Sequence, residues 1–176
     1  FAQFVEDGGY DAQEFWHPQG WEWLQREGRR SPRHVDQLRH GVLAQRFGKL
    51  MRVPMAQPVV HVSWHEADAW CRWAGRRLPS EVEWEAAAHQ GASRGFRWGD
   101  VWEWTSSPLR PWPGFTPMIY RQYTEPFFEG NGAGDYKVLR GGSWAVSPDI
   151  LRPSFRNWDH PIRRQIFSGV RLAWDA

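Results

Sequence analysis

The sequence predicts an α+β domain that is rich in loops. Two helix patterns stand in the middle of the chain, and short strand-like runs separated by Gly and Pro follow them, an order that is typical of α+β folds. The 176 residues include 14 Trp, 17 Gly and 13 Pro, and this composition favours an irregular fold that aromatic packing holds together. The length fits one domain over residues 1–176 with a core of its own.

Residues 1–56 show little hydrophobic periodicity, because Gly and Pro interrupt them repeatedly. We therefore expect Trp16, Trp21 and Trp23 to be loop aromatics that pack onto the domain, not members of a helix face. The charged residues 26–33 are expected at a solvated surface. The run QPVVHV at residues 57–62 predicts a short strand.

Two helices follow with clear start and stop signals. Each begins with a capping box, at Ser63–Glu66 and at Ser80–Glu83, in which the Ser and Glu side chains satisfy backbone N–H groups of the first turn. Apolar residues then recur at helical spacing, and Gly75 and Gly91 end the two patterns.

The remainder of the chain predicts short strands and long loops. The strand candidates are VWEWTSS (101–107), YKVLRGGSW (136–144) and SGVRLAWD (168–175), with Pro- and Gly-rich segments between them. The expected fold therefore has two helices and a set of short antiparallel strands.

Charge and composition exclude several classes of protein. A net charge of +2 is too small to indicate a nucleic-acid-binding protein. No apolar run reaches the roughly 18 residues that a membrane-spanning helix needs. The single Cys71 excludes a disulfide scaffold. The opening FAQFVEDGGY is neither a signal nor a transit peptide, and we interpret it as the interior of a longer protein.

Four phrases in order carry a resemblance to a known family: VSWHEADAWCRWAGRRLPSEVEWEAAA (62–88), VWEWTSS (101–107), VLRGGSW (138–144) and GVRLAW (169–174). Together they resemble the formylglycine-generating-enzyme domain, which implies a C-type-lectin-like fold. The segments at 106–128 and 151–175, with the opening FVEDGGY, resemble more closely the C-terminal domain of the actinobacterial sulfoxide synthases of ergothioneine biosynthesis.

That resemblance implies a cytoplasmic oxidoreductase. Such enzymes use non-haem iron and O₂ to join the thiol sulfur of γ-glutamylcysteine to the imidazole of hercynine. Their iron ligands are histidines of an N-terminal, DinB-like domain, which we expect upstream of this chain and as its partner. We therefore expect no metal ligand in this chain. Related domains often bind a structural Ca²⁺, so Ca²⁺ is a further cofactor candidate.

The chain departs from the family at Gly99–Asp100. Family members usually carry tens of residues between the phrases at Trp98 and Val101, whereas only two residues intervene here. Either the chain has a true deletion or residues are missing at this point.

Tyr120 is the candidate catalytic residue. It lies in the loop PWPGFTPMIY, and loops are where catalytic groups concentrate. A phenol can donate a proton or a hydrogen bond to an oxygen atom, and the resemblance implies that Tyr120 is the acid at the iron site. Tyr123 is the nearby alternative candidate, although packing or a supporting position behind the site is the role expected for it.

Asp159 and Arg163 are the candidate residues for the thiol substrate. An α-amino acid end needs one carboxylate and one guanidinium as partners, but spacing alone favours a structural ion pair. The resemblance implies that the two residues hold γ-glutamylcysteine. Asn157 and Trp158 are candidates for hercynine, because an aromatic face suits its quaternary ammonium group. The adjacent Arg164 is expected to be structural.

Three other features are interpreted as structural. His61 and His65 resemble a metal motif, but they need not share a face of one element. Gly141 and Gly142 follow Arg140 in a signature of the fold and indicate a close backbone approach. Cys71 lies on the apolar face of the first helix, and a single Cys cannot supply the Cys pair of a copper-dependent formylglycine-generating oxidase.

Two alternatives to the sulfoxide synthase stay open. C-type-lectin-like folds also serve as binding modules without chemistry, with the loops at 108–135 as the recognition surface. A sister enzyme that uses cysteine, a selenosugar or another thiol is the second alternative, because residues outside this chain also shape the thiol pocket.

Overall fold

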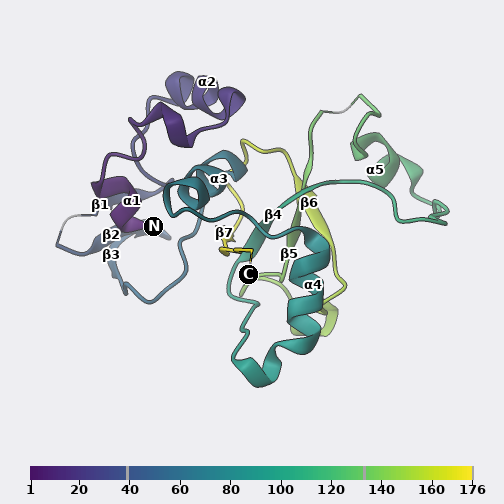
Figure 1. The fold of residues 1–176 in the computed structure, drawn as a ribbon. Coiled ribbons are helices and arrows are strands. Elements are labelled where there is room, and N and C mark those ends of the chain that lie inside the picture. The colour runs from purple at the N-terminus through teal and green to yellow at the C-terminus, as the bar shows by residue number, and fades with distance from the viewer. Residues whose placement is uncertain (39, 133, 176) are drawn as a thin grey trace.

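The computed structural model describes residues 1–38, 40–132 and 134–175. Five helices lie at α1 (Ala2–Glu6), α2 (Pro18–Glu27), α3 (Trp64–Trp73), α4 (Glu81–Gln90) and α5 (Arg121–Thr124). Short 3-10 turns occur at Gln13–Phe15, Ala92–Arg94, Glu125–Phe127 and Pro148–Ile150. The strands are β1 (Val35–Gln37), β2 (Val42–Arg46), β3 (Lys49–Val53), β4 (Trp102–Pro108), β5 (Lys137–Arg140), β6 (Asn157–Asp159) and β7 (Ser168–Val170). The content is α+β and loop-rich, as the sequence predicts (Figure 1).

A four-stranded sheet with the order β6-β5-β4-β7 forms the centre of the domain. β4 and β5 pair antiparallel, and so do β5 and β6. β4 and β7 run parallel, with Trp104 opposite Val170, so the prediction that the strands are all antiparallel is wrong at this edge. The parallel pair arises because the chain crosses from β6 back over the sheet before it enters β7. α4 packs on β4 and β5.

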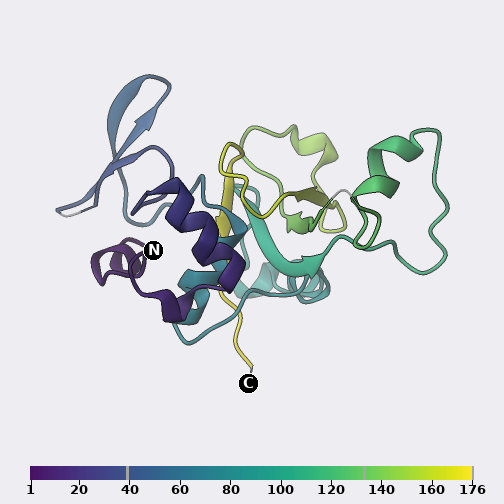
Figure 2. The same cartoon turned by 90° about the horizontal axis from the view of Figure 1, so that it is seen from above.

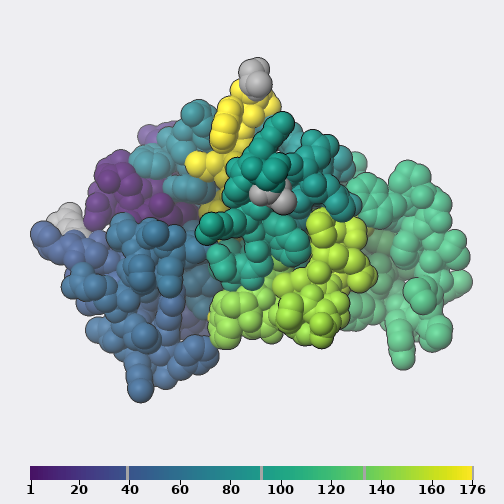
Figure 3. Space-filling model, turned by 90° about the horizontal axis from the view of Figure 1, so that it is seen from below, coloured from purple at the N-terminus to yellow at the C-terminus, as the bar shows by residue number. Residues whose placement is uncertain are grey.

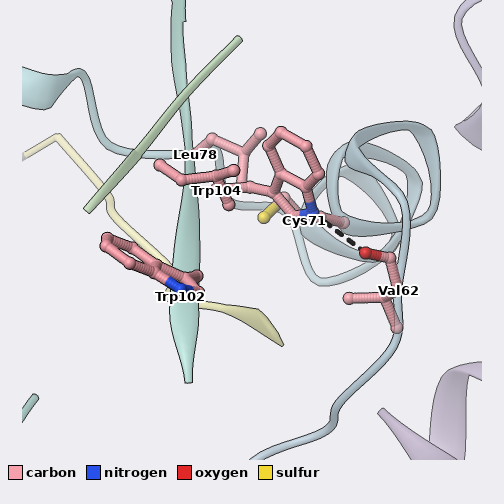
Figure 4. Packing of buried hydrophobic residues seen from close by; sticks show 7 residues of the cluster. Val62, Cys71, Leu78, Trp102 and Trp104 are labelled. Atoms are coloured by element: carbon pink, nitrogen blue, oxygen red, sulfur yellow. Dashed lines mark hydrogen bonds between the residues drawn. The ribbon is translucent and has the colours of Figure 1, made fainter. Parts of the chain in front are cut away.

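The main core lies between this sheet and α3. Val62, Cys71, Leu78 and Trp104 are at most 2% exposed and pack together with Trp102 (Figure 4). The indole Nε1 of Trp104 donates to the carbonyl oxygen of Val62 at 2.9 Å, which satisfies a polar atom that burial would otherwise leave without a partner. Burial raises the pKa of the Cys71 thiol to about 12, so Cys71 is a packing residue here.

Both predicted capping boxes are present. Ser63 caps α3 and Ser80 caps α4, each accepting from the backbone N–H of a Glu three residues later, whose carboxylate accepts in return. Ala74 is the C-cap of α3, and the next residue, Gly75, lies in the left-handed region with φ 64°. α4 ends at Gly91 with φ −93°, so this second glycine ends the helix without a left-handed turn.

The expectation for the first 56 residues is wrong in part. Trp21 and Trp23 lie on a helix, α2, whose face with Trp23 and Leu24 is buried. Pro18 occupies its first turn and Gly28 its left-handed C-terminal position, with φ 65°. Pro at the start and Gly at the end are typical of a helix. In the sequence alone, the same two residue types are also typical of loops.

The segments around the first sheet also differ from expectation. β1, β2 and β3 form a three-stranded antiparallel sheet that the sequence pattern does not predict. The predicted strand at 57–62 is irregular instead. Its backbone cannot continue a ladder, because Pro58 has no N–H and His61 is left-handed with φ 63°. The later strands are shorter than predicted and occupy 137–140 and 168–170.

The small sheet and the loop lobe, which we define as residues 109–132, lie at opposite ends of the domain. All three views place the strands β1–β3 at one end and the segment with α5 at the other (Figures 1, 2 and 3). The lobe is anchored on the central sheet by Leu109, Phe128 and Val138, which form a separate buried cluster. This anchor holds α5 beside β6, where the candidate site residues lie.

Candidate functional site

β6 carries three of the candidate site residues in consecutive positions. Asn157 pairs with Leu139, Trp158 with Val138 and Asp159 with Lys137 of β5. Because side chains alternate along a strand, Asn157 and Asp159 point to one face and Trp158 to the other. The three residues are therefore adjacent in sequence, but they do not form one cluster.

Asp159 and Arg163 form an ion pair, the arrangement that their spacing alone favours. Arg163 Nε donates to Asp159 Oδ1 at 3.1 Å, and the same oxygen accepts from the backbone N–H of His160 at 2.8 Å. The Arg163 side chain is 53% exposed and that of Asp159 20%. The pair is accessible, and its opposite charges complement a carboxylate and an ammonium group.

Trp158 connects β6 to the loop lobe. Its ring lies 5.6 Å from that of Tyr123 and 6.3 Å from that of Phe127, measured between ring centroids. Trp158 is half-buried, so part of its ring stays accessible. Tyr123 thus packs against Trp158, a candidate binding residue. Asn157 uses its Oδ1 to accept from the backbone N–H of Trp158.

Tyr120 lies at the N-terminal end of α5 and is 77% exposed. Met118 and Ile119, directly before it, are 84% and 85% exposed. Among the described residues, no hydrogen bond or ring contact holds the Tyr120 side chain, and none joins it to Asp159 or Arg163. Residues 118–120 together form an exposed, largely apolar tip of the loop lobe.

The His61–His65–Glu66 pattern has structural partners. His61 Nδ1 lies 2.9 Å from the carbonyl oxygen of Ile166. The His65 ring packs between Trp23 and Trp64, and burial, with smaller effects of His17, His160 and Lys137, lowers its pKa to about 4. Within the described residues, no group of three His, Cys, Asp or Glu side chains is arranged to hold a metal ion.

Arg140, Gly141 and Gly142 are structural, as predicted. Arg140 is fully buried, pairs with Glu85 and stacks on Trp84 at 5.6 Å. Gly142 has φ 75°, and a Cβ there would lie 2.2 Å from a Leu151 methyl carbon. Only glycine fits this turn.

The sequence reasoning missed one buried network behind the site. Tyr10 donates to Glu66 Oε1 at 2.6 Å, and Arg164 Nη2 donates to the same oxygen at 2.8 Å. Burial, more than the charge of Glu66, raises the pKa of the Tyr10 hydroxyl. Glu66 and Arg164 are 98 positions apart, so no local pattern signals their contact. The network fixes Arg164, the neighbour of Arg163, against α3.

Comparison with known proteins agrees with this architecture. The model of the sulfatase-modifying factor enzyme 1-like domain matches residues 1–100 and 97–176. The chain therefore belongs to this family, the family of formylglycine-generating-enzyme-like domains. No described helix has the length and apolar character to cross a membrane.

Among curated relatives, the chain is most usefully compared with three. It is 50% identical over 99% of its length to hercynine oxygenase of Mycolicibacterium smegmatis, and 47% identical over 99% to that of Mycobacterium tuberculosis. Formylglycine-generating enzyme of Streptomyces coelicolor is 34% identical over 68% of the chain, which covers 53% of that enzyme. The chain spans about half the length of the hercynine oxygenases, 50% in both cases.

The comparisons bear on the junction at Gly99–Asp100. The two matched stretches of the family meet at residues 97–100. The alignment with the Mycolicibacterium smegmatis enzyme covers 219 residues, although this chain has 176. That relative therefore carries residues without a counterpart here, and their position between Gly99 and Asp100 stays a prediction.

Proposed function

We propose that this chain is the C-terminal, substrate-positioning part of an O₂-dependent sulfoxide synthase. The reaction joins the sulfur of γ-glutamylcysteine to the imidazole of hercynine. One thiol, one imidazole C–H and one O₂ give a sulfoxide and one water, so atoms and electrons balance without a further reductant. The observation that carries the proposal is the accessible Asp159–Arg163 pair at the end of β6. The chain that holds this pair is 50% identical to a hercynine oxygenase over 99% of its length.

In this proposal, Asp159 and Arg163 hold the amino acid end of the thiol substrate. The carboxylate of Asp159 accepts from the substrate ammonium, and the guanidinium of Arg163 donates to the substrate carboxylate. The existing contact between the two side chains uses Arg163 Nε, and within the described residues neither terminal nitrogen of Arg163 has a hydrogen-bond partner, so both can bind a carboxylate. The pair fixes the direction in which the substrate sulfur points.

Trp158 and Asn157 are the proposed groups for hercynine. The accessible part of the Trp158 ring offers a π face to the trimethylammonium group, which has no N–H to donate. Tyr123 and Phe127 pack on the same ring and keep its plane fixed. Because side chains alternate along β6, Asn157 lies on the same face as Asp159 and Trp158 on the opposite face. In this proposal, Asn157 therefore lies between the hercynine and thiol positions.

Tyr120 is the proposed acid. Its phenol donates a proton to oxygen as O₂ is reduced, and the exposed tip at 118–120 supports this role, because the group is free to face another domain. Once that domain covers the tip, water is excluded and the proton transfer becomes directed. The chain by itself leaves Tyr120 in solvent, so we expect it to be inactive alone.

Iron fits this proposal only through the rest of a longer protein. The described residues offer no three-ligand set for a metal, so no step is assigned to a metal held by this chain. The proposed partner is an upstream iron-binding domain, the proposed location is the cytoplasm, and a structural Ca²⁺ stays a prediction.

The test is an assay of the longer protein that contains this chain, loaded with Fe(II) under O₂. Hercynine and γ-glutamylcysteine are supplied, and sulfoxide formation is followed by mass spectrometry. We expect product only when iron, O₂ and both substrates are present. Cysteine in place of γ-glutamylcysteine tests the sister-enzyme alternative. Absence of any C–S product with either thiol would overturn the proposal and favour a binding module.

A further inference from the structure

A polar pocket of about 500 Å³ lies beside the candidate thiol site. Its walls come from the C-terminal end of α2, the loop after it and the loop after β6. Four arginines line it, together with Trp23 and His160: Arg29, Arg33, Arg163 and Arg164. Arg163 belongs both to this pocket and to the pair with Asp159, so the pocket is continuous with the candidate site.

Arg164 is the fixed part of this pocket. It is 4% exposed, and its Nη2 donates to Glu66 at 2.8 Å and to the carbonyl oxygen of Ser31 at 2.7 Å. Its guanidinium lies over the Trp23 ring at 5.4 Å. Its Nε, however, is buried and has no hydrogen-bond partner in the described part of the chain. A buried N–H without an acceptor is costly, and a bound acceptor would relieve that cost.

Arg29 and Arg33 are the unpaired cations of the pocket. The described residues place no carboxylate within ion-pair distance of either side chain, whereas the neighbouring Arg30 pairs with Asp11. The acidic residue in the lining is Glu27, whose carboxylate lies 3.7 Å from Arg164 Nη1. The pocket therefore holds more positive than negative charge, which favours an anion.

The lowered pKa of the neighbouring His34 is consistent with this positive charge. Burial lowers the pKa of its imidazole, and the charges of Arg33, Arg29 and Arg164 lower it further. The guanidinium groups are thus close enough to act together on one nearby site. Guanidinium groups bind carboxylates in preference to most neutral groups, because the two-pronged geometry matches.

We propose that this pocket binds a carboxylate group of the thiol substrate, with Arg29 and Arg33 as binding residues that set its specificity. The inference rests on the proposed function. γ-Glutamylcysteine has two carboxylates and one ammonium group, so Asp159 suffices for the ammonium, but Arg163 alone does not satisfy both carboxylates. The pocket supplies the additional cations within reach of Arg163.

A binding measurement that needs neither iron nor O₂ tests the pocket. The purified protein is titrated by calorimetry with glutarate, a simple dicarboxylate, and with glutaramide, its neutral isostere. We expect saturable binding of glutarate and none of glutaramide. Arg33→Gln and Arg29→Gln should each weaken glutarate binding about tenfold, the size of one lost charged hydrogen bond. Both side chains reach solvent, so the variants are expected to fold.

Arg26→Gln is the matched control. Arg26 is exposed on the last turn of α2 and does not line the pocket, so this variant removes the same charge a short distance away. Unchanged glutarate binding in Arg26→Gln supports a specific pocket, while an equal loss in all three variants would mean only a general charge effect and would overturn the proposal. Equal binding of glutarate and glutaramide would overturn it too.

The same variants separate this inference from the proposed function. In the longer protein, Arg33→Gln should raise the KM for γ-glutamylcysteine with little change in kcat. If sulfoxide forms and this KM is unchanged, the pocket assignment is wrong and the proposed function stands. If glutarate binds through Arg29 and Arg33 but no sulfoxide forms, the carboxylate pocket stands and the proposed function is wrong.

Discussion

Arg164 Nη2 and Glu66 Oε1 lie 2.8 Å apart in the interior of the domain, where neither side chain is more than 5% exposed. This ion pair ties the loop after β6 to the first turn of α3. Through it, the positions of Asp159 and Arg163 depend on the same helix that carries the main core.

The first prediction concerns this ion pair. Glu66→Ala leaves Arg164 buried without its carboxylate and should lower the free energy of unfolding by about 3–5 kcal/mol, as is usual when one partner of a buried pair is removed. Tyr10→Phe removes one hydrogen bond to the same carboxylate and should cost only about 1 kcal/mol. Urea unfolding at pH 7 measures both. An equal loss of unfolding free energy in the two variants would contradict the prediction, because the ion pair would then stabilise the fold no more than the Tyr10 hydrogen bond.

The second prediction concerns pH. Burial holds the pKa of His65 at about 4, below its usual 6.5. Between these values the unfolded chain binds a proton that the folded chain does not, so stability falls as the pH falls from 6.5 to 4. The slope from this group reaches at most about 1.4 kcal/mol per pH unit.

Urea unfolding between pH 7.5 and 4.5 measures this slope, with His65→Phe as the comparison. The variant keeps a ring against Trp23 and Trp64 but cannot titrate. The slope in this range should be smaller in His65→Phe than in the unmodified protein. Parallel curves would assign the pH dependence to other groups.

The third prediction concerns Tyr120 in the longer protein. Tyr120→Phe removes the proposed proton donor and should slow C–S bond formation by roughly 10²–10⁴-fold, the range for a general acid. Binding of γ-glutamylcysteine should change little, because Tyr120 contacts neither Asp159 nor Arg163. Tyr123→Phe keeps its ring on Trp158 and is the matched control. A wild-type rate of sulfoxide formation in Tyr120→Phe would remove Tyr120 as the acid.

The fourth prediction concerns Arg163. Arg163→Ala removes a carboxylate partner and should raise the KM for the thiol at least about tenfold. Its side chain is 53% exposed, so stability should change by less than about 1 kcal/mol. Initial rates at saturating hercynine give the KM, and thermal unfolding gives the control. An unchanged KM would place Arg163 outside the site.

Local signals in the sequence predicted α3 and α4 accurately. The capping boxes at Ser63 and Ser80 act within one helical turn, so no distant contact is needed to recognise them. The strand β4 was predictable for a related reason, since two Trp and a Thr stand close together in its first four residues, all of which are buried.

The same reasoning failed for the β2–β3 hairpin and for α2. The β3 residues are almost all exposed, so no alternation of burial marks that strand, and the turn between the strands is formed by Phe47 and Gly48, both with positive φ. Asn-Gly is the usual sequence signal for such a turn, whereas Phe-Gly does not predict a hairpin turn. In α2, Gly20 lies inside the helix because His65 packs against it.

The sequence by itself determined the boundaries of α3 and α4, the family, and the choice of Tyr120, Asp159 and Arg163 as candidate residues, because these depend on local patterns and motifs. Only the tertiary structure decided which charges meet. Arg29 and Arg33 join Arg163 and Arg164 across more than a hundred positions of the chain, and Arg164 pairs with Glu66, which is 98 positions away in sequence. Such long-range contacts leave no periodic trace in the sequence, since they arise where separately stable segments pack together.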